Sequence, residues 1–203
     1  MDKHVLIPRP ETEQLVNKSL DVLANFDSRR QVSNRALKRA TTELKNFVVA
    51  DIGTGSGCIA ISIAHSYLQP KIRLAYGESR QAYHLPPKTY ATDLSPAALQ
   101  IARRNAQNVL GTSHNITFLQ GNLLEPLPEK ADLIIANLPY LSEREYAETR
   151  PEVKQEPKEA LLGGGPNGQS LIKQLLKRAP EYLKPSGKVI YESTGGVVLE
   201  WDN

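Results

Sequence analysis

Cysteine is nearly absent from this chain: Cys58 stands alone among 203 residues, so an intramolecular disulfide is excluded. Such cysteine usage is typical of a reducing cytoplasm, and we expect a cytoplasmic location. No apolar run approaches the roughly 18 residues of a membrane span, and the N-terminus has no signal-peptide core, so no membrane association is expected. The four histidines (His4, His65, His84 and His114) have no metal-ligand spacing, so no metal site is predicted.

An excess of charge is also missing. The 25 lysines and arginines against 22 acidic residues leave a net charge of +3, which is too mild to establish a nucleic-acid partner. Basic residues do concentrate between positions 29 and 45 (Arg29, Arg30, Arg35, Lys38, Arg39 and Lys45). The ordinary interpretation is the solvated face of a surface helix, and the alternative is a weak contact with RNA or the ribosome.

Glycine is present at three alternate positions of the segment Asp51-Ile-Gly-Thr-Gly-Ser-Gly57. This segment follows an apolar run, 47–50, and precedes a helix-like stretch, 58–64. Glycines placed in this way let the backbone turn sharply from strand to helix and approach a ligand that a Cβ atom would repel. The segment predicts a cofactor cradle, and its alternative is a tight turn with no ligand.

A second segment, Ala136-Asn-Leu-Pro-Tyr140, ends another apolar run, 131–136. It places an amide, a rigid proline and an aromatic ring one after another at the carboxyl end of a predicted strand. Ligands of open α/β sheets bind at the carboxyl ends of strands. The segment therefore predicts a clamp for a small planar polar group, and its alternative is a strand-end turn with a buried tyrosine.

Strands and helices alternate along the chain. Helical spacing over 11–26, after Pro10, predicts a first helix with Thr12 as its cap, and Ser95-Pro96 predicts the start of a helix through 108. The second strand is predicted at 88–93 rather than 71–76, with a loop at 77–87 between them. The other predicted strands are 47–52, 116–119, 133–136 and 188–192, with further helices over 57–67 and 168–183 and an edge strand over 197–201. This order predicts a doubly wound, mostly parallel α/β sheet over 46–203, after a helical lead-in over 1–45.

The spacing of the glycines distinguishes between nucleotide-binding loops. A Walker loop needs Lys-Ser or Lys-Thr after its last glycine, and here Cys58 follows. A dinucleotide fingerprint has glycines at its first, third and sixth positions, and here they stand at the first, third and fifth. Asp51 would repel a pyrophosphate but suits the cationic S-adenosylmethionine. With Asp93 as acceptor for both ribose hydroxyls, S-adenosylmethionine is the expected cofactor.

Five segments of this chain carry a family resemblance. They are Leu6-Ile-Pro-Arg-Pro-Glu-Thr-Glu13, Asp51–Gly57, Ala91-Thr-Asp-Leu-Ser-Pro96 with Asn105-Ala106, Asn137–Tyr140, and Glu156-Pro157 through Ala160-Leu-Leu-Gly-Gly164 to Gly168. With these segments the chain resembles the Rossmann-like class I S-adenosylmethionine methyltransferases that methylate a glutamine side-chain amide in peptide-chain release factors. The resemblance covers about residues 5 to 192. It implies a protein methyltransferase whose partner is a release factor.

The resemblance also implies a set of site residues. Asn137, Leu138, Pro139 and Tyr140 would form the catalytic clamp, in which the Asn137 oxygen and the Leu138 carbonyl accept the two amide hydrogens of glutamine. The residues that would bind the cofactor are Asp51, Gly53, Thr54, Gly55, Gly57, Asp93, Leu94, Asn122, Leu123 and Asn137. Arg9, Pro10, Thr12 and Glu13 would join Asn137, Pro139 and Tyr140 around the substrate. A surface ion pair between Arg9 and Glu13 is the alternative for the first group.

The chain departs from the family pattern in three ways. Leu138 replaces the usual proline of the clamp, which keeps an N6-adenine RNA or DNA methyltransferase as the alternative function. The family's N-terminal helical domain has no counterpart, and residues 193–203 are too short for the family's C-terminal hairpin. A truncated, non-catalytic S-adenosylmethionine-binding remnant is therefore a further alternative. Acidic residues outnumber basic ones after the clamp, and this surface should disfavour a polynucleotide (Glu143, Glu145, Glu148, Glu152 and Glu156 against Arg144, Arg150 and Lys154).

Overall fold

The computed structural model describes residue 5 and residues 9–28, 47–68, 86–112, 114–193 and 197–202. Three sequence predictions fall wholly or mostly outside these ranges. They are the basic segment over 29–45, the alternative second strand over 71–76, and the loop over 77–87, of which only positions 86 and 87 are described.

A six-stranded sheet forms the centre of the molecule, in the order β3-β2-β1-β4-β5-β6. The strands are β1 (Val48–Ile52), β2 (Lys88–Asp93), β3 (Ile116–Gln120), β4 (Ala131–Ala136), β5 (Leu183–Ser193) and β6 (Val197–Asp202). The first five are parallel to one another, and β6 runs antiparallel along β5. This confirms the predicted doubly wound, mostly parallel sheet and its last edge strand.

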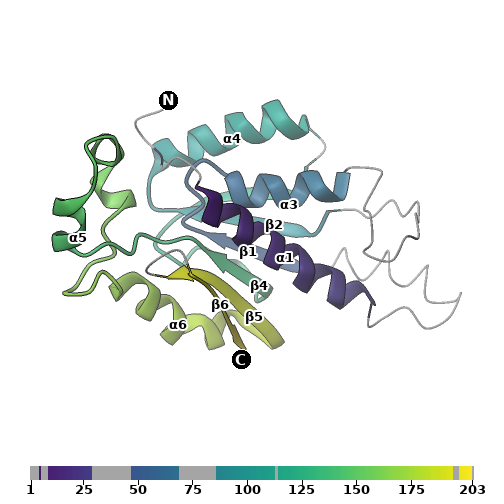
Figure 1. The fold of residues 1–203 in the computed structure, drawn as a ribbon. Coiled ribbons are helices and arrows are strands. Elements are labelled where there is room, and N and C mark those ends of the chain that lie inside the picture. Colours follow the sequence, from purple (N-terminus) through teal and green to yellow (C-terminus); the bar gives the residue numbers. More distant parts are fainter. Residues whose placement is uncertain are drawn as a thin grey trace, which may run out of the picture.

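Helices cover both faces of the sheet. Helices α1 (Pro10–Ser28), α3 (Cys58–Leu68) and α4 (Pro96–Leu110) lie on one face, and α6 (Ser170–Tyr182) lies on the other, as Figure 1 shows. The short helix α5 (Glu143–Glu148) and the 3₁₀ turns η1 (Val153–Gln155) and η2 (Lys158–Ala160) stand beyond the carboxyl end of β4. Among the described residues, no helix has both the length and the apolar character that a membrane crossing needs.

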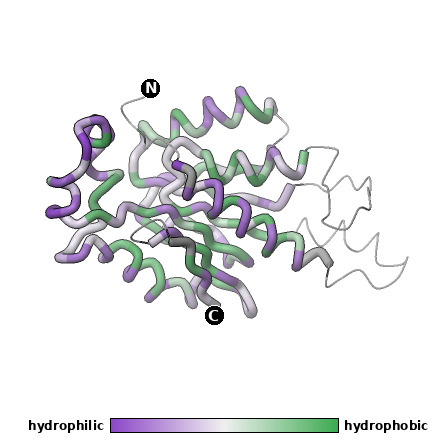
Figure 2. Tube along the Cα trace, in the orientation of Figure 1, coloured by the Kyte–Doolittle hydropathy of each residue, from purple (hydrophilic) through white to green (hydrophobic). Residues whose placement is uncertain are grey.

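Alternate residues of the central strands enter different hydrophobic clusters. In β1, Val48, Ala50 and Ile52 face α6, whereas Val49 faces α1 and α3. Figure 2 shows hydrophobic residues along the strands and hydrophilic residues gathered around α5. Burying a large aliphatic side chain stabilises the fold by roughly 1.5–3 kcal/mol. The hydrophobic clusters on the two faces of the sheet therefore hold the strands, and with them their carboxyl ends, in fixed positions.

Local signals placed the starts of α4 and α1 to within one residue, but the cap predicted for α1 was wrong. The Ser95 hydroxyl accepts the Ala98 amide at 3.2 Å, as predicted for an N-cap. Thr12, by contrast, lies inside the first turn of α1 and does not cap it. Its hydroxyl accepts the amide of Arg9, which precedes the helix, at 3.3 Å.

Strand β5 begins five residues earlier than position 188, where the sequence pattern placed it. Its Leu183 already pairs with Ala131 of β4, and the register shifts before Leu133 pairs with Lys188. The Pro185-Ser-Gly187 segment therefore forms an irregularity within the strand, in which Ser186 has a φ of 64°. The sequence pattern misplaced the start of β5 because a turn signal consists of adjacent residues, whereas the strand that pairs with this segment lies some fifty positions away.

Candidate active site

The glycine loop joins β1 to α3 with three residues in the left-handed region. The φ angles of Gly53, Gly55 and Gly57 are 71°, 56° and 81°. At Gly57 a Cβ would lie 2.9 Å from Ile61 Cδ1 and 3.1 Å from Ala102 Cβ, so the helices pack too closely for any side chain. At Gly55 the nearest atom to an added Cβ is 4.0 Å away, so this glycine borders open space that a ligand can use.

Asp51 lies fully buried beneath this loop. Its Oδ2 accepts the Thr54 hydroxyl at 2.6 Å and the Ala60 amide at 3.1 Å, while its Oδ1 has no hydrogen-bond partner. Burial raises the pKa of Asp51 to about 6, and these two hydrogen bonds oppose the shift. A buried carboxylate oxygen without a partner is costly, and a donor or cation from a ligand would relieve it.

Asp93 ends β2 and holds two backbone segments together. Its Oδ2 accepts the Gly55 amide at 2.9 Å and its Oδ1 accepts the Ser95 amide at 2.8 Å. Each carboxylate oxygen has capacity for a second donor, so Asp93 can still accept two ligand hydroxyls. Leu94, the next residue, exposes 69% of its surface and is an apolar platform beside this carboxylate.

The loop after β3 lies next to Asp93. The Gly121 amide donates to the Asp93 carbonyl at 3.1 Å, and the Leu123 carbonyl accepts the Thr92 hydroxyl at 3.1 Å. Leu123 has a φ of 48°, and Asn122 is exposed. Asn122 and Leu123, both predicted to bind the cofactor, therefore stand at the same sheet edge as Asp93 and Leu94.

Asn105 on α4 supports the glycine loop from behind. Its Nδ2 donates to the Ser56 carbonyl at 2.9 Å. This bond joins two of the segments that carry the family resemblance.

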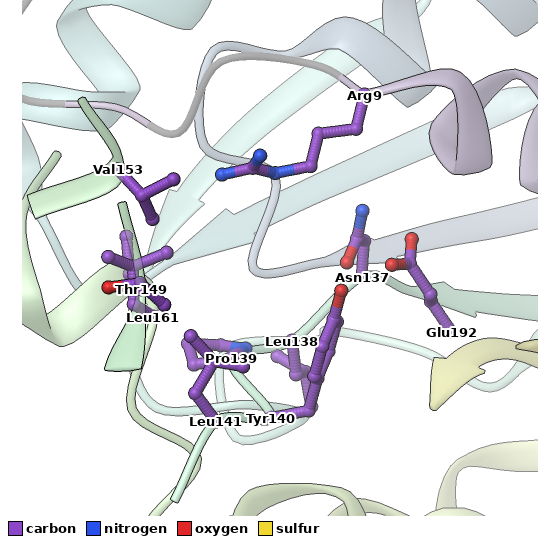
Figure 3. A pocket seen from close by; sticks show the side chains of 11 residues that line it. Arg9, Asn137, Leu138, Pro139, Tyr140, Leu141, Thr149, Val153, Leu161 and Glu192 are labelled. Atoms are coloured by element: carbon purple, nitrogen blue, oxygen red, sulfur yellow. The ribbon is translucent and has the colours of Figure 1, made fainter. Parts of the chain in front are cut away.

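The predicted clamp lines a cavity of about 200 Å³ beyond β4. Asn137, Pro139 and Tyr140 form one side, and Val153 and Leu161 stand opposite, as Figure 3 shows. The Asn137 Nδ2 donates to the Thr12 hydroxyl at 3.3 Å. This bond turns the amide nitrogen toward α1 and leaves the Asn137 oxygen as the acceptor on the cavity side.

The residue before α1 forms a further wall of the cavity. Arg9 lines it, and its guanidinium pairs with Glu156 at 3.1 Å. The alternative prediction, a surface ion pair between Arg9 and Glu13, was wrong, because Arg9 pairs with Glu156 and Glu13 lies exposed on α1. Pro10 is the first residue of α1. Arg9 and Thr12 therefore reach the clamp, whereas Glu13 points to solvent.

Two glycines of the segment 160–168 pack directly on the clamp's backbone. A Cβ at Gly163 would lie 2.4 Å from the Pro139 carbonyl oxygen, and one at Gly168 would lie 2.1 Å from that of Tyr140. The Leu141 amide also donates to the Leu161 carbonyl at 2.9 Å. The glycines of this segment thus set the shape of the clamp.

Sequence reasoning missed Glu192, which also lines the cavity. The residue is 2% exposed, and its carboxylate lies near the Tyr140 hydroxyl. Burial raises the pKa of Glu192, and burial together with the neighbouring Glu192 charge raises the pKa of Tyr140 to about 12. An acidic residue directly after the run Val189-Ile-Tyr191 was the signal that could have identified it.

The glycine loop and the predicted clamp are in contact. A Cβ at Gly53 would lie 2.9 Å from Leu138 Cδ2. The glycine loop and the cavity are therefore adjacent parts of one site at the carboxyl edge of the sheet. In the part of the chain that the structure describes, no three histidine, cysteine or acidic side chains gather as they would around a metal ion.

Comparisons with known proteins agree with this geometry. The release factor glutamine methyltransferase of Rhodopirellula baltica is 37% identical over 197 residues, which cover 95% of this chain and 55% of that protein. The release factor glutamine methyltransferase of Synechocystis sp. is 38% identical over 197 residues, which cover 95% of this chain and 54% of that protein. The chain thus spans about half the length of the curated relatives it matches.

Among solved structures, the fold is similar to ribosomal protein L11 methylase from Lactobacillus delbrueckii subsp. bulgaricus. The TM-score is 0.48 at 21% identity, over 90% of this chain and 60% of the other. The profile of the family described as "Methyltransferase domain" matches residues 43–197, which include the glycine loop, Asp93 and the clamp. This chain therefore belongs to the methyltransferase-domain family.

Proposed function

We propose that this chain transfers a methyl group from S-adenosylmethionine to the side-chain amide nitrogen of a glutamine in a peptide-chain release factor. The observation that carries the proposal is the Asn137 amide, which Thr12 orients so that its oxygen lies on the cavity side of the clamp. The similarity to release factor glutamine methyltransferases over 95% of the chain supports the choice of substrate.

The residues around the glycine loop fit S-adenosylmethionine. Gly55 leaves space that a Cβ would fill, and the buried Asp51 Oδ1 has no partner. Asp93 would accept the ribose hydroxyls, with Leu94 and Asn122 beside the adenine. When bound, the cofactor supplies a methyl group made electrophilic by a sulfonium.

A glutamine amide nitrogen is a poor nucleophile, because its lone pair is delocalised into the carbonyl. The Asn137 oxygen and the Leu138 carbonyl would accept its two hydrogens and hold the nitrogen in line with the methyl group. Tyr140 would pack on the flat face of the amide, and Pro139 fixes the backbone between them with its φ near about −65°. Positioning of this kind supplies up to roughly 7–11 kcal/mol in favourable cases.

The surface charge argues less strongly against a nucleic acid than the sequence suggested. Three of the five glutamates after the clamp are paired: Glu143 with Lys158, Glu148 with Arg144, and Glu156 with Arg9. Glu145 is used in the capping box of α5. The preference for a protein substrate therefore rests on the clamp and on the relatives rather than on the charge.

Labelled S-adenosylmethionine tests the proposal directly. The chain is incubated with a release factor, with the same factor carrying Ala at its acceptor glutamine, and with ribosomal RNA. Label is expected only in the unaltered factor. Labelling of the altered factor, or preferential labelling of the RNA, would replace this function with another substrate class. Absence of label in all three, with cofactor binding intact, would favour a non-catalytic binding protein.

A further inference from the structure

Glu192 and Asn137 follow the last paired positions of two neighbouring strands. Ala136 of β4 is in register with Tyr191 of β5, and these two residues come one position later. Neighbouring strands lie about 4.7–4.9 Å apart, so the two side chains begin side by side. On its other side Glu192 is paired with Val198 of β6.

Both side chains leave the sheet on the face covered by α1. Ile135 and Ile190 pack in the cluster with Leu15 of α1, and side chains two positions along a strand share its face. Asn137 and Glu192 are those positions. The charged groups of this region that act on Glu192 are Glu11 and Arg9, together with the Tyr140 hydroxyl.

One carboxylate oxygen of Glu192 has no hydrogen-bond partner among the described residues. The Oε2 of the carboxylate is buried without a partner, in a side chain that lines the cavity. Figure 3 shows the carboxylate beside Asn137 and the Tyr140 hydroxyl. Buried polar atoms in native proteins are nearly always satisfied, so an orphan acceptor in a cavity indicates a donor that arrives with a ligand.

We propose that Glu192 is the proton acceptor of the methyl transfer. This inference rests on the proposed function. As the nitrogen–carbon bond to the donor's methyl group forms, the sulfur keeps the electron pair of the broken carbon–sulfur bond. The nitrogen, now cationic, keeps the hydrogen held by the Leu138 carbonyl and loses the one held by the Asn137 oxygen as a proton, which passes to the free oxygen of Glu192 beside Asn137. The neutral carboxylic acid then returns that proton to solvent.

The surroundings suit this role. Burial and the nearby Glu11 raise the pKa of Glu192, while the Tyr140 hydroxyl and Arg9 lower it. The carboxylate is the form that accepts a proton, so activity should fall as the pH drops through the pKa of Glu192. A positioned general base typically contributes about 10²–10⁴-fold to a rate.

Glu192→Gln tests the inference, because glutamine keeps the shape of the side chain but cannot take up the proton as a carboxylate does. Single-turnover methylation of the release factor is measured against pH for the wild type, for Glu192→Gln and for the exposed control Glu181→Gln. Independently of activity, infrared difference spectra of the free chains follow the carboxylic acid band that Glu192→Gln removes and give the pKa of Glu192.

We expect Glu192→Gln to slow methylation by about 100-fold or more and to remove the acid limb of the profile. In the wild type and the control, that limb should coincide with the infrared pKa. Methylation by Glu192→Gln within a few-fold of wild type, or an acid limb that persists in it, would overturn the inference while leaving the proposed function intact. A wild-type chain that binds cofactor but methylates nothing would overturn both.

Discussion

The Arg9 guanidinium and the Glu156 carboxylate lie 3.1 Å apart, although 147 positions separate them in the chain. The pair joins the start of α1 to the segment between η1 and η2, and Arg9 lines the cavity at this junction. Glu156 is the more enclosed partner, with 7% of its side chain exposed against 37% for Arg9, and its Oε2 has no partner. The pair therefore closes one wall of the candidate substrate site.

Breaking this pair should weaken substrate binding more than chemistry. Arg9→Ala leaves the Glu156 carboxylate enclosed without its cation, so we expect at least a tenfold rise in KM for the release factor with kcat within a few-fold. Arg9→Ala combined with Glu156→Gln should recover part of that loss. Steady-state kinetics of the two variants check this, and an unchanged KM in Arg9→Ala would contradict it.

Asp93 should govern cofactor affinity. Two hydrogen bonds from ribose hydroxyls to a charged acceptor contribute roughly 1.5–3 kcal/mol each, so Asp93→Ala should reduce S-adenosylmethionine affinity at least tenfold. Because Asp93 also holds the Gly55 and Ser95 amides, thermal unfolding must be recorded alongside calorimetry. A variant that remains folded and binds the cofactor like the wild type would remove Asp93 from the site.

Asn137 should act on chemistry more than on cofactor affinity. Asn137→Ala is expected to suppress methyl transfer by about two orders of magnitude, because loss of alignment raises the barrier directly. Calorimetry should place cofactor binding within a few-fold of wild type. The exposed α4 residue Asn108, changed to alanine, is the matched control. Parallel loss of binding and activity in Asn137→Ala would indicate a structural turn.

Two glycines with the same φ angle allow the cost of backbone strain to be measured apart from the cost of a steric clash. Gly168 and Gly111 both have a φ of 68°, but an added Cβ meets the Tyr140 carbonyl at 2.1 Å in the first and nothing within 4 Å in the second. Gly111→Ala should therefore lower the free energy of unfolding by about 1–2 kcal/mol, from left-handed strain alone. Gly168→Ala should lower it by about 2 kcal/mol more, and impair methylation. Equal losses of unfolding free energy in the two variants, measured by denaturant titration, would mean that the clamp backbone can move to accommodate the added methyl group.

Asp51 should make stability fall as the pH rises from about 4 to about 6. Its pKa is raised by burial from 3.8 to about 6 in the folded chain, so folding favours its protonated form. The stabilisation is complete below the ordinary pKa and is lost as the pH passes the folded one, by about 3 kcal/mol in total. Asp51→Asn should lose this dependence. Free energies of unfolding of both chains at pH 4 and pH 7 give the difference, and parallel curves would count against it.

The fold was largely predictable because its signals are local. The apolar strands and the Ser95 cap each follow from a few adjacent residues, and the right-handed winding of strand and helix arranges them in a parallel sheet. The start of β5 was misplaced because Pro185-Ser-Gly187 has the composition of a turn. Only its pairing with β4 makes it part of a strand.

The site was predictable where one segment carries the geometry, as in the glycine loop. Partners that come from distant segments were not. Arg9 meets Glu156 rather than the nearer Glu13, because the helix directs Glu13 outward. Glu192 belongs to no motif, and its place in the cavity follows only from the register of β5 beside β4.

The 2.9 Å separation between an added Cβ at Gly53 and Leu138 Cδ2 has a thermodynamic consequence. The loop proposed to bind the methyl donor and the clamp proposed to bind the acceptor pack against each other without a gap, so displacement of either one should move the other. Packed elements of this kind transmit binding energy, and linkage is reciprocal. Any factor by which the methyl donor changes the affinity for the acceptor must equal the factor by which the acceptor changes the affinity for the donor, and a bulkier residue at position 138 would alter both together.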